Sequence, residues 1–423
     1  MKPTRARLGV LALITFATTL NYVDRSVMGV AQPSLVRELG IGPEMMGLIF
    51  SAFSWTYAFA QIPGGLVLDR LGARLTYGLS LGFWSMATVL HGLMSSVVGL
   101  FSARLALGLA EAPSFPTNSR ILSTWFPQTE RARANSVYAV GQYVGLGFMI
   151  PVLTYIAATW GWRTLFFIFG ALGIVYALVW YAIYREPHES KHANEAELDY
   201  IAAGGGLAAE GSPFVLSWAA VGALLKTRQI LGASIGQFCS NSTLVFFLTW
   251  FPSYLATERG MDWIQSGFAA SLPYLGASVG VLFGGVVSDE IIRRTGSATF
   301  GRKMPIIAGL LLTSTMVLAN FTSSNVVVVA VMSVAFFGQG MANLGWTLIA
   351  DVAPKKVMGL TGGIFNLCAN LAGIVTPLVV GFVLGATGTF YGALTYIAVL
   401  GLVGAAAYVF ILGDVKRVEI AGA

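Results

Sequence analysis

Four ionisable residues lie inside segments of this chain that are otherwise apolar. Asp24 and Arg25 are adjacent in the first apolar segment, and Arg104 and Glu111 lie seven residues apart in the fourth. A charged side chain at the centre of a bilayer costs roughly 2.5–3.5 kcal/mol on insertion scales. Arginine binds a carboxylate through charge-assisted hydrogen bonds, and a carboxylate can carry a proton. The four residues predict an anion-binding and proton-coupling site that faces an aqueous cavity.

The spacing of the four residues predicts how they face one another. Arg104 and Glu111 are separated by about two helical turns, so both side chains can face the same cavity. Consecutive helical residues point about 100° apart, so Arg25 is expected to reach toward a different helix from Asp24. A second interpretation stays open, in which each arginine only neutralises Asp24 or Glu111 in a fixed ion pair.

The composition predicts an all-α integral membrane protein. Of 423 residues, 56% are hydrophobic and 10% are charged, whereas soluble domains carry about 25% charged residues. The apolar runs are about 20 residues long, which suits spanning helices and not the ten-residue alternating strands of a membrane barrel. We expect twelve transmembrane helices, at roughly 8–34, 43–68, 76–96, 98–122, 134–158, 164–184, 229–256, 264–288, 304–322, 326–350, 359–385 and 389–413.

The distribution of lysine and arginine predicts the orientation. Nineteen of the 25 basic residues fall in the two termini and the loops on the same side, and the opposite loops hold only Arg37, Arg163 and Arg259. Because basic residues gather on the cytoplasmic side, both termini are expected there, in a multi-pass protein of the bacterial inner (plasma) membrane. The net charge of +6 then reflects membrane orientation, and no nucleic-acid partner is implied.

An internal repeat divides the chain into halves. Three pairs of residues share an offset of 220 positions: Gly47 with Gly267, Gly65 with Gly285, and Asp69 with Asp289. A polar, glycine-punctuated connection lies between the halves. The repeat predicts two six-helix bundles related by pseudo-two-fold symmetry, at 1–184 and 229–423, joined by a cytoplasmic linker at 185–228.

Several stretches carry a resemblance to a known family. The segment from Gly65 to Arg74 resembles the signature loop of the major facilitator superfamily. Further stretches resemble the anion:cation symporter family, particularly its bacterial sugar-acid members: 21–25, 50–57, 61–65, 104–116, 125–127, 247–252 and 413–417. The resemblance implies a monomer in the lipid bilayer that imports a hexonate or hexarate, such as galactonate, glucarate or galactarate, with protons by alternating access. The substrate would bind at mid-membrane between the two bundles.

The resemblance also implies roles for individual residues. Asp24 and Glu111 match the family's proton-coupling carboxylates. Asn343 stands where galactonate-transporting members have serine, which leaves aldonate and aldarate substrates open. Gln237 and Asn241 share a helix face and could line the cavity, although hydrogen bonding between helices is an alternative for any of these polar residues. The expected substrate-binding residues are Tyr22, Arg25, Tyr57, Arg104, Gln142, Gln237, Asn241, Asn343, Trp346 and Asn366.

Residues at the cytoplasmic helix ends are expected to act as gates. Asp69 and Asp289 each lie beside arginines, so each can pair with a basic residue and favour one closed conformation; an ordinary interfacial ion pair is the alternative. The predicted gating set is Asp69, Arg70, Arg74 and Asp289. Pro113, Pro116, Pro151 and Pro377 are expected to bend their helices, because proline removes a backbone donor.

Enzyme chemistry finds little support in the sequence. The three histidines, His91, His188 and His192, are too scattered for a metal cluster, and there is no phosphate-binding loop with Gly-Lys-Ser/Thr. We therefore expect no catalytic residue, cofactor or metal. Three alternatives remain: a symporter for another organic anion such as a tartrate or an aromatic carboxylate, a non-transporting ligand sensor and, with the weakest support, a membrane enzyme.

Overall fold

The computed structural model describes residues 3–206, 218–354 and 357–419, and every regular element within these ranges is helical. Eleven of these helical stretches are long and apolar enough to cross a membrane. One of them, the 51-residue α2 (Pro43–Leu93), is interrupted at Gly72, where φ is 74° and ψ is 169°. It therefore contains two of the predicted spans. The prediction of a twelve-helix, multi-pass membrane protein is confirmed.

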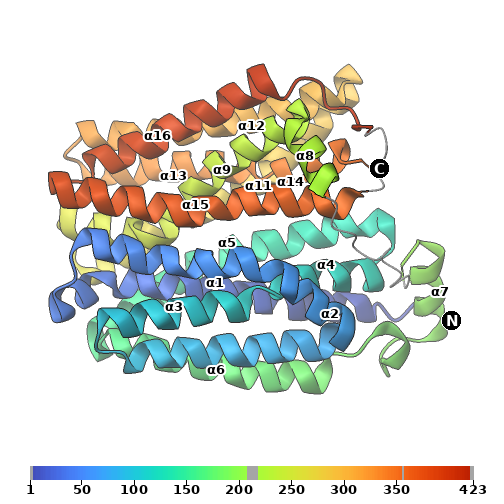
Figure 1. Cartoon of the computed structure of the whole chain (residues 1–423), viewed down its shortest axis with the longest axis horizontal. Coiled ribbons are helices and arrows are strands. Elements are labelled where there is room, and N and C mark those ends of the chain that lie inside the picture. Colours follow the sequence, from blue (N-terminus) through green and yellow to red (C-terminus); the bar gives the residue numbers. More distant parts are fainter. Residues whose placement is uncertain (1–2, 207–217, 355–356, 420–423) are drawn as a thin grey trace. The chain divides into compact units, whose positions relative to one another are not determined.

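The chain folds into two compact units (Figure 1). Unit 1 comprises residues 1–40, 52–149 and 155–212, and unit 2 comprises 41–51, 150–154 and 213–423. The predicted bundle boundaries at 184 and 229 stay a prediction. Unit 1 contains α1 (Ala6–Leu39), most of α2, α3 (Val97–Glu111), α4 (Ser114–Trp125), most of α5 (Gln128–Trp160), α6 (Trp162–Ile183), η1 (Pro187–Glu189) and α7 (Glu195–Ala203).

Unit 2 holds the second half of the chain. It contains α8 (Trp218–Lys226), α9 (Arg228–Thr249), α10 (Phe251–Ser253), η2 (Tyr254–Glu258), α11 (Trp263–Thr295), α12 (Ala298–Ser314), η3 (Thr315–Phe321), α13 (Asn325–Ala342), α14 (Gly345–Val352), α15 (Met358–Thr387), α16 (Tyr391–Ala406) and η5 (Ala407–Ile411). A hydrophobic core joins α9, α12, α14, α15 and α16 through buried residues that include Leu310, Leu348 and Phe365.

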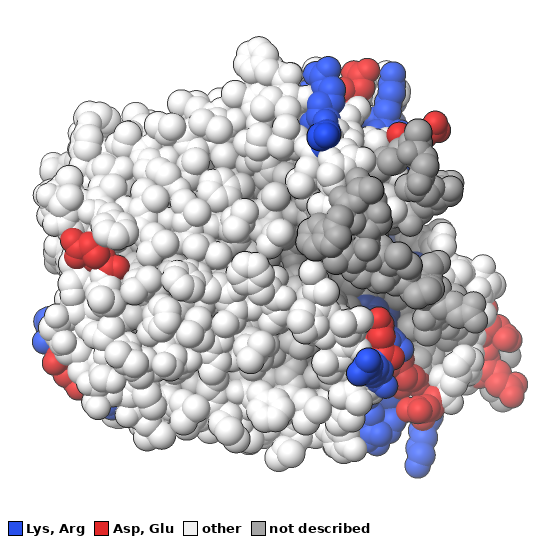
Figure 2. All heavy atoms as spheres, viewed as in Figure 1, with Lys and Arg blue, Asp and Glu red and all other residues white. Residues whose placement is uncertain are grey.

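Local sequence signals set the ends of the long helices. Helix α1 ends at Gly40, whose φ of 62° suits glycine because it has no side chain. The side chain of Asp262 accepts a hydrogen bond from the backbone N–H of Gln265 and so caps the start of α11, which ends at Gly296 with φ 68°. Between such ends the helices run through apolar sequence. In the view of Figure 2, charged side chains gather at the helix ends and the middle stretches carry almost none.

The first glycine pair of the repeat makes equivalent contacts within unit 2. A Cβ atom on Gly47 would collide with the backbone carbonyl of Pro377 in α15, and one on Gly267 would collide with Thr154 and lie 3.2 Å from the Cα of Pro151 in α5. Both glycines of the pair therefore lie at close helix crossings within unit 2.

Two equivalent spans are each interrupted near the middle by a two-residue turn whose backbone stays in the right-handed helical region. The fourth span divides into α3 and α4 at Ala112–Pro113, and the tenth divides into α13 and α14 at Asn343–Leu344. A glycine of the repeat packs close to each break: a Cβ on Gly64 would lie 3.1 Å from Pro113, and one on Gly284 would lie 3.0 Å from Met341. The expected bends stay predictions: a turn interrupts the helix at Pro113, whereas Pro116, Pro151 and Pro377 lie inside helices.

The linker contributes a helix to unit 1. Helix α7 is held by Glu197, which is fully buried and accepts hydrogen bonds from Arg7 Nη1 and from the backbone N–H of Arg5, both at 2.8 Å. Arg7 also pairs with Glu130 of α5 at 2.8 Å, and the Tyr200 hydroxyl donates to the same carboxylate. Three separate segments of the chain thus meet at one charged cluster. Residues 207–217 of the predicted linker lie outside the described ranges.

Glu197→Gln is expected to destabilise unit 1. The substitution keeps the shape of the side chain but removes its charge, so two charge-assisted hydrogen bonds, each worth about 1.5–3 kcal/mol, are weakened. The midpoint of thermal unfolding in detergent should fall by several degrees. Glu195→Gln, on the exposed face of the same helix, is the matched control and should leave the midpoint unchanged. Equal midpoints for both variants would show that α7 is held by other contacts.

Candidate functional site

A buried ion pair joins the first and fourth spans within unit 1. Arg25 Nε donates to Glu111 Oε2 at 2.9 Å, and the Glu111 side chain is fully buried. Arg25 therefore reaches a different helix, as its spacing from Asp24 predicts. Ser114 Oγ donates to the Glu111 carbonyl at 2.6 Å, which satisfies a backbone acceptor where α3 gives way to α4. The ion pair lies at the break in the fourth span.

Aromatic rings surround the two arginines. The guanidinium of Arg25 lies 5.0 Å from the ring of Tyr22 and 4.7 Å from the rings of both Phe53 and Tyr57. Arg104 lies 5.5 Å from the ring of Phe53, so this ring contacts both cations. Cation–π contacts of desolvated groups are worth about 2 kcal/mol. The rings stabilise the cations without occupying the hydrogen-bonding groups that an anion needs.

Arg104 differs from Arg25 in making no ion pair with a carboxylate among the described residues, although the Glu111 carboxylate is near enough to attract its charge. Its side chain is 3% exposed, and it makes no hydrogen bond or ion pair within the described part of the chain. A buried cation without a partner is costly, so its presence calls for a ligand or a function. The Arg104 guanidinium can offer two parallel N–H groups to a carboxylate, which makes it the better placed of the two arginines to hold an anion.

Among the carboxylates of the cluster, Asp24 resembles Arg104 in being buried and making no ion pair in the described part of the chain. It is 2% exposed, and neither of its oxygens has a hydrogen-bond partner among the described residues. The indole of Trp84 lies close enough to interact with it but forms no hydrogen bond. An ionised carboxylate in this position is uncompensated, so the site favours the protonated acid. Asp24 is thus suited to take up a proton when the site is closed to water.

The charges of the cluster can be matched to an anion. With both carboxylates ionised, Arg25 and Arg104 balance Asp24 and Glu111, so the four residues carry no net charge. One bound proton leaves the cluster at +1, and a monoanion then restores neutrality; a dianion requires two protons. Neutrality matters here because uncompensated charge in a low-dielectric site is expensive. The number of carboxylates therefore permits either stoichiometry.

Other expected residues of unit 1 lie beside the cluster. Gln142 is buried, and its side chain interacts with the Tyr22 hydroxyl. Tyr57 is buried, stacks on Phe53 with ring centroids 5.2 Å apart and interacts with Arg25. The structure thus brings together Tyr22, Asp24, Arg25, Tyr57, Arg104, Glu111 and Gln142. It adds Asn21, Phe53 and Trp84, which the sequence did not single out. Phe53 precedes Tyr57 by one helical turn, and that spacing was an available signal.

The expected residues of unit 2 form a looser group. Trp346 follows the break between α13 and α14, is 38% exposed, and meets Phe365 edge-on with centroids 4.9 Å apart. A Cβ on Gly345 would lie 2.8 Å from Gln237 Oε1, so Gln237 of α9 borders the same break. Asn343 is the last residue before it. Polar and aromatic side chains therefore converge where the tenth span is interrupted.

Three asparagines of unit 2, Asn241, Asn366 and Asn370, make hydrogen bonds within the bundle. Asn241 Nδ2 donates to the Ala369 carbonyl at 2.5 Å and so ties α9 to α15. This contact matches the alternative of hydrogen bonding between helices, and the cavity role expected for Asn241 has less support from its environment. Asn370 Nδ2 donates to Asn366 Oδ1 at 3.2 Å, so these two share a helix face as their spacing predicts.

The expected gating residues find partners distant in sequence. Asp69 lies 3.8 Å from Arg120 within α4, and Asp289 lies 3.3 Å from Arg302 of α12. Arg302 also pairs with Asp351 at 2.9 Å. The neighbouring arginines do not serve as partners: Arg74 donates to the Tyr181 carbonyl, Arg293 and Arg294 pair with Glu290, and Arg70 is exposed and makes no ion pair in the described ranges.

No group of three or more histidine, cysteine, aspartate or glutamate side chains is placed to hold a metal ion among the described residues. The Arg25–Glu111 cluster offers arginine donors and carboxylates that can exchange protons, without a grouping of acids around one point. Its chemistry suits an organic anion better than a cation.

Known proteins match this chain over nearly its whole length. A family model described as the Major Facilitator Superfamily matches residues 14–299. The chain is 42% identical to the D-galactonate transporter of Escherichia coli O6:H1, covering 99% of this chain and 98% of that protein. It is 41% identical to the probable galactarate/D-glucarate transporter of Escherichia coli K12 (99% and 96%) and 39% identical to that of Bacillus subtilis 168 (99% and 94%).

Solved structures agree with the fold. A bacterial homologue of the human lysosomal transporter Spinster, in an inward-facing and occupied conformation, superposes with a TM-score of 0.78 at 18% identity, covering 98% of this chain and 99% of that chain. A nucleoside transporter gives a TM-score of 0.69 at 14% identity, with 95% and 99% covered. At these identities the likeness concerns the fold alone.

Proposed function

Because the chain belongs to the Major Facilitator Superfamily, we propose that it imports a sugar-acid anion together with protons by alternating access. Relatives about 40% identical carry the names of galactarate/D-glucarate and D-galactonate transporters. The single observation that carries the proposal is the buried Arg104, a cation without a carboxylate partner in a cluster that also holds two protonatable carboxylates. We place the protein in the bacterial inner membrane with both termini in the cytoplasm.

The proposed substrate is a hexonate or a hexarate. Its carboxylate would bind Arg104, while Tyr22, Tyr57 and Gln142 supply neutral donors and acceptors for its hydroxyls. Gln237, Asn343 and Trp346 at the interruption of the tenth span, together with Asn366 of α15, are proposed to contact the sugar backbone. These groups can make directional hydrogen bonds to several hydroxyls, which a purely charged site could not recognise.

Proton coupling follows from the two carboxylates. Asp24 takes up a proton because it has no cation beside it, and this leaves net positive charge for the anion. Glu111 links protonation to occupancy, because its partner Arg25 is released when Glu111 becomes neutral. Release of the anion to the cytoplasm then favours loss of the proton. Asp69 and Asp289, with Arg120 and Arg302, are proposed to stabilise one closed conformation at the cytoplasmic helix ends.

The test is uptake of galactonate and glucarate into proteoliposomes under an inward proton gradient. Wild-type protein should accumulate at least one of the acids, and a protonophore should abolish accumulation. Glu111→Gln keeps an oxygen that can accept from Arg25 but cannot release or bind a proton, so it should lose accumulation and retain exchange of labelled for unlabelled substrate. Glu189→Gln, at an exposed position in η1, is the matched control and should behave as wild type.

Two outcomes would contradict the proposal in different ways. Uptake that is the same with and without the proton gradient would show that the transporter is not a proton symporter. The proposed substrate class would be unaffected by this result. Failure to transport either acid, with protein that is folded by circular dichroism, would show that the substrate class is wrong.

A further inference from the structure

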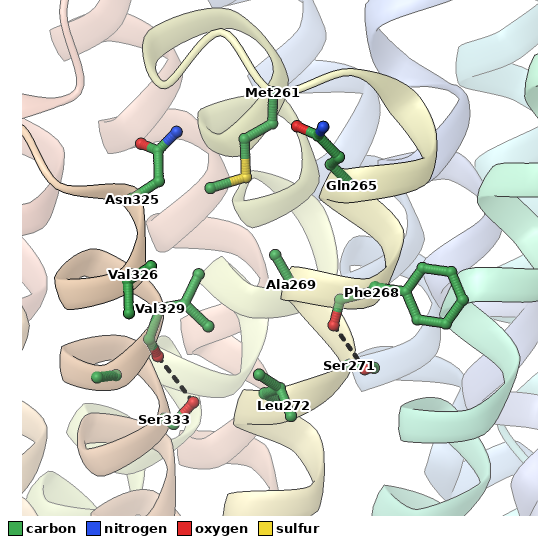
Figure 3. Close-up of a pocket in the computed structure, with 11 residues that line it drawn as sticks. Met261, Gln265, Phe268, Ala269, Ser271, Leu272, Asn325, Val326, Val329 and Ser333 are labelled. Carbon is green, nitrogen blue, oxygen red and sulfur yellow. Dashed lines mark hydrogen bonds between the residues drawn. The ribbon is translucent and has the colours of Figure 1, made fainter.

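A groove opens between the starts of α11 and α13 in unit 2 (Figure 3). Its volume is about 600 Å³, within the range of small-molecule sites of about 300–1,000 Å³. The lining residues are Met261, Gln265, Phe268, Ala269, Ser271, Leu272, Asn325, Val326, Val329, Ala330 and Ser333. All belong to unit 2, and none is part of the anion-binding cluster.

The deeper part of the groove is apolar. Its two serines present no free hydroxyl hydrogen, because Ser271 donates to the Phe268 carbonyl and Ser333 to the Val329 carbonyl, each at 2.7 Å. Small side chains such as Ala269 and Ala330 leave the space between the two helices open. From Asn325 to Ser333, α13 rises about 12 Å, which is less than half of a hydrocarbon core about 30 Å thick. The groove therefore has the depth of part of one leaflet.

The groove faces lipid. Phe268 is 63% exposed and Val326 is 79% exposed, and both lie in membrane-spanning helices. Water does not solvate such side chains in a bilayer, so acyl chains must cover them. In the orientation inferred from the basic residues, the starts of α11 and α13 lie on the external side, and the groove belongs to the outer leaflet.

Polar groups gather at one end of the groove. Figure 3 shows the amides of Gln265 and Asn325 on opposite sides of this end, with Met261 between them. Arg259 Nε donates to Asn325 Oδ1 at 3.2 Å, which brings a guanidinium to the same place. Arg259 makes no ion pair with a carboxylate within the described ranges. A cation is thus available where a lipid phosphate would lie.

Two acidic residues, Glu258 and Asp262, lie within three positions of Arg259 in the sequence. Asp262 is exposed and uses Oδ1 to accept from the Gln265 N–H at 2.8 Å, which leaves Oδ2 available. Glu258, next to Arg259 in sequence, accepts from the backbone N–H of Phe390. One cation and two carboxylates disfavour a purely anionic headgroup. They complement a headgroup that carries a phosphate and a primary ammonium side by side.

We propose that this groove binds one molecule of phosphatidylethanolamine. One acyl chain fills the space between α11 and α13, the phosphate accepts hydrogen bonds from Arg259 and Asn325, and the ammonium donates to Asp262. Phosphatidylcholine lacks N–H donors for the carboxylate, and phosphatidylglycerol lacks the positive charge. The proposal does not depend on which anion the protein transports.

Native mass spectrometry of delipidated protein tests the proposal with dioleoyl phosphatidylethanolamine, phosphatidylcholine and phosphatidylglycerol. Wild-type protein should retain one phosphatidylethanolamine at least fivefold more than either competitor. Ala330→Phe, which fills the groove, should remove this preferential retention, and Arg259→Gln should weaken it. Ala406→Phe makes the same substitution at an exposed position of α16 that does not line the groove and should have no effect.

Asp262→Asn tests the headgroup separately, because asparagine caps a helix as well as aspartate does. This variant should retain phosphatidylglycerol as well as it retains phosphatidylethanolamine. Equal retention of the three lipids by wild-type protein would overturn the headgroup assignment. Unchanged retention of phosphatidylethanolamine in Ala330→Phe would overturn the location, and every bound lipid would then be part of the general annulus.

Discussion

Arg104→Gln should weaken substrate binding by about 100-fold or more. Arg104 is the buried arginine without a carboxylate partner, so a substrate carboxylate can occupy both of its N–H groups. Hydrogen bonds to charged groups are worth about 1.5–3 kcal/mol each, and about 3 kcal/mol corresponds to more than 100-fold in the dissociation constant. Arg104→Lys keeps the charge but loses the two parallel donors, so its affinity should be intermediate. Calorimetric titration of purified protein measures the effect.

Thermal stability without substrate distinguishes the two arginines. Arg104 makes no ion pair in the described ranges and is attracted only at longer range by Glu111, so Arg104→Gln should unfold close to the temperature of wild type. Arg25→Gln leaves Glu111 without its cation and should unfold at a lower temperature, because breaking a buried pair costs about 3–5 kcal/mol. Arg163→Gln, a half-exposed position that pairs with Glu38, controls for the substitution itself. Normal binding by Arg104→Gln with lost binding by Arg25→Gln would assign the carboxylate to Arg25.

Asp24→Asn should make substrate binding insensitive to alkaline pH. In the wild type, the anion binds together with a proton, so its affinity should fall by about tenfold per pH unit once the site has to take up that proton from solution. Asparagine resembles the protonated acid and stays neutral, so the variant should keep its affinity at alkaline pH. Titration of purified wild-type and variant protein over a series of pH values measures the slope.

The same substitution should abolish concentrative uptake. The neutral amide that replaces the Asp24 carboxyl group cannot release a proton to the cytoplasm, so the proton gradient no longer drives accumulation, while exchange of bound substrate continues. Asp199→Asn, at an exposed position of α7, is the matched control for uptake. If Asp24→Asn kept both the wild-type pH slope and accumulation, Asp24 would have no part in coupling and Glu111 alone would carry it.

The sequence predicts the fold well because each spanning helix can be recognised from its own run of consecutive residues. A run of about 20 apolar residues is sufficient evidence for a spanning helix, and the 220-residue offset reveals the duplication. The break at Pro113 could also be predicted, because proline lacks a backbone donor. The equivalent break after Asn343 has no proline, and only the packing of the tenth span reveals it.

The site is predicted less completely because its pairings are not local. Spacing indicates that Arg25 reaches another helix, but it does not identify Glu111 as the partner. It also does not show that Asp24 and Arg104 make no ion pair among the described residues. The partners of Asp69 and Asp289 were equally hidden, since Arg120 and Arg302 lie 51 and 13 residues away along the chain. Which arginine lies nearest in sequence is a poor guide to which arginine lies nearest in space.

The glycines beside the two helix interruptions show how the two duplicated halves of the chain differ. Gly64 packs against Pro113 and Gly284, 220 positions later, packs against Met341, so both halves have a residue without a side chain at this crossing while the residues that they contact differ. A duplicated gene is free to lose whatever one copy no longer needs. Both halves keep the close crossing, but only the first half has a proline where the adjoining helix is interrupted. Chimaeras that exchange residues 112–113 with residues 343–344 would therefore show whether each half requires its own form of interruption.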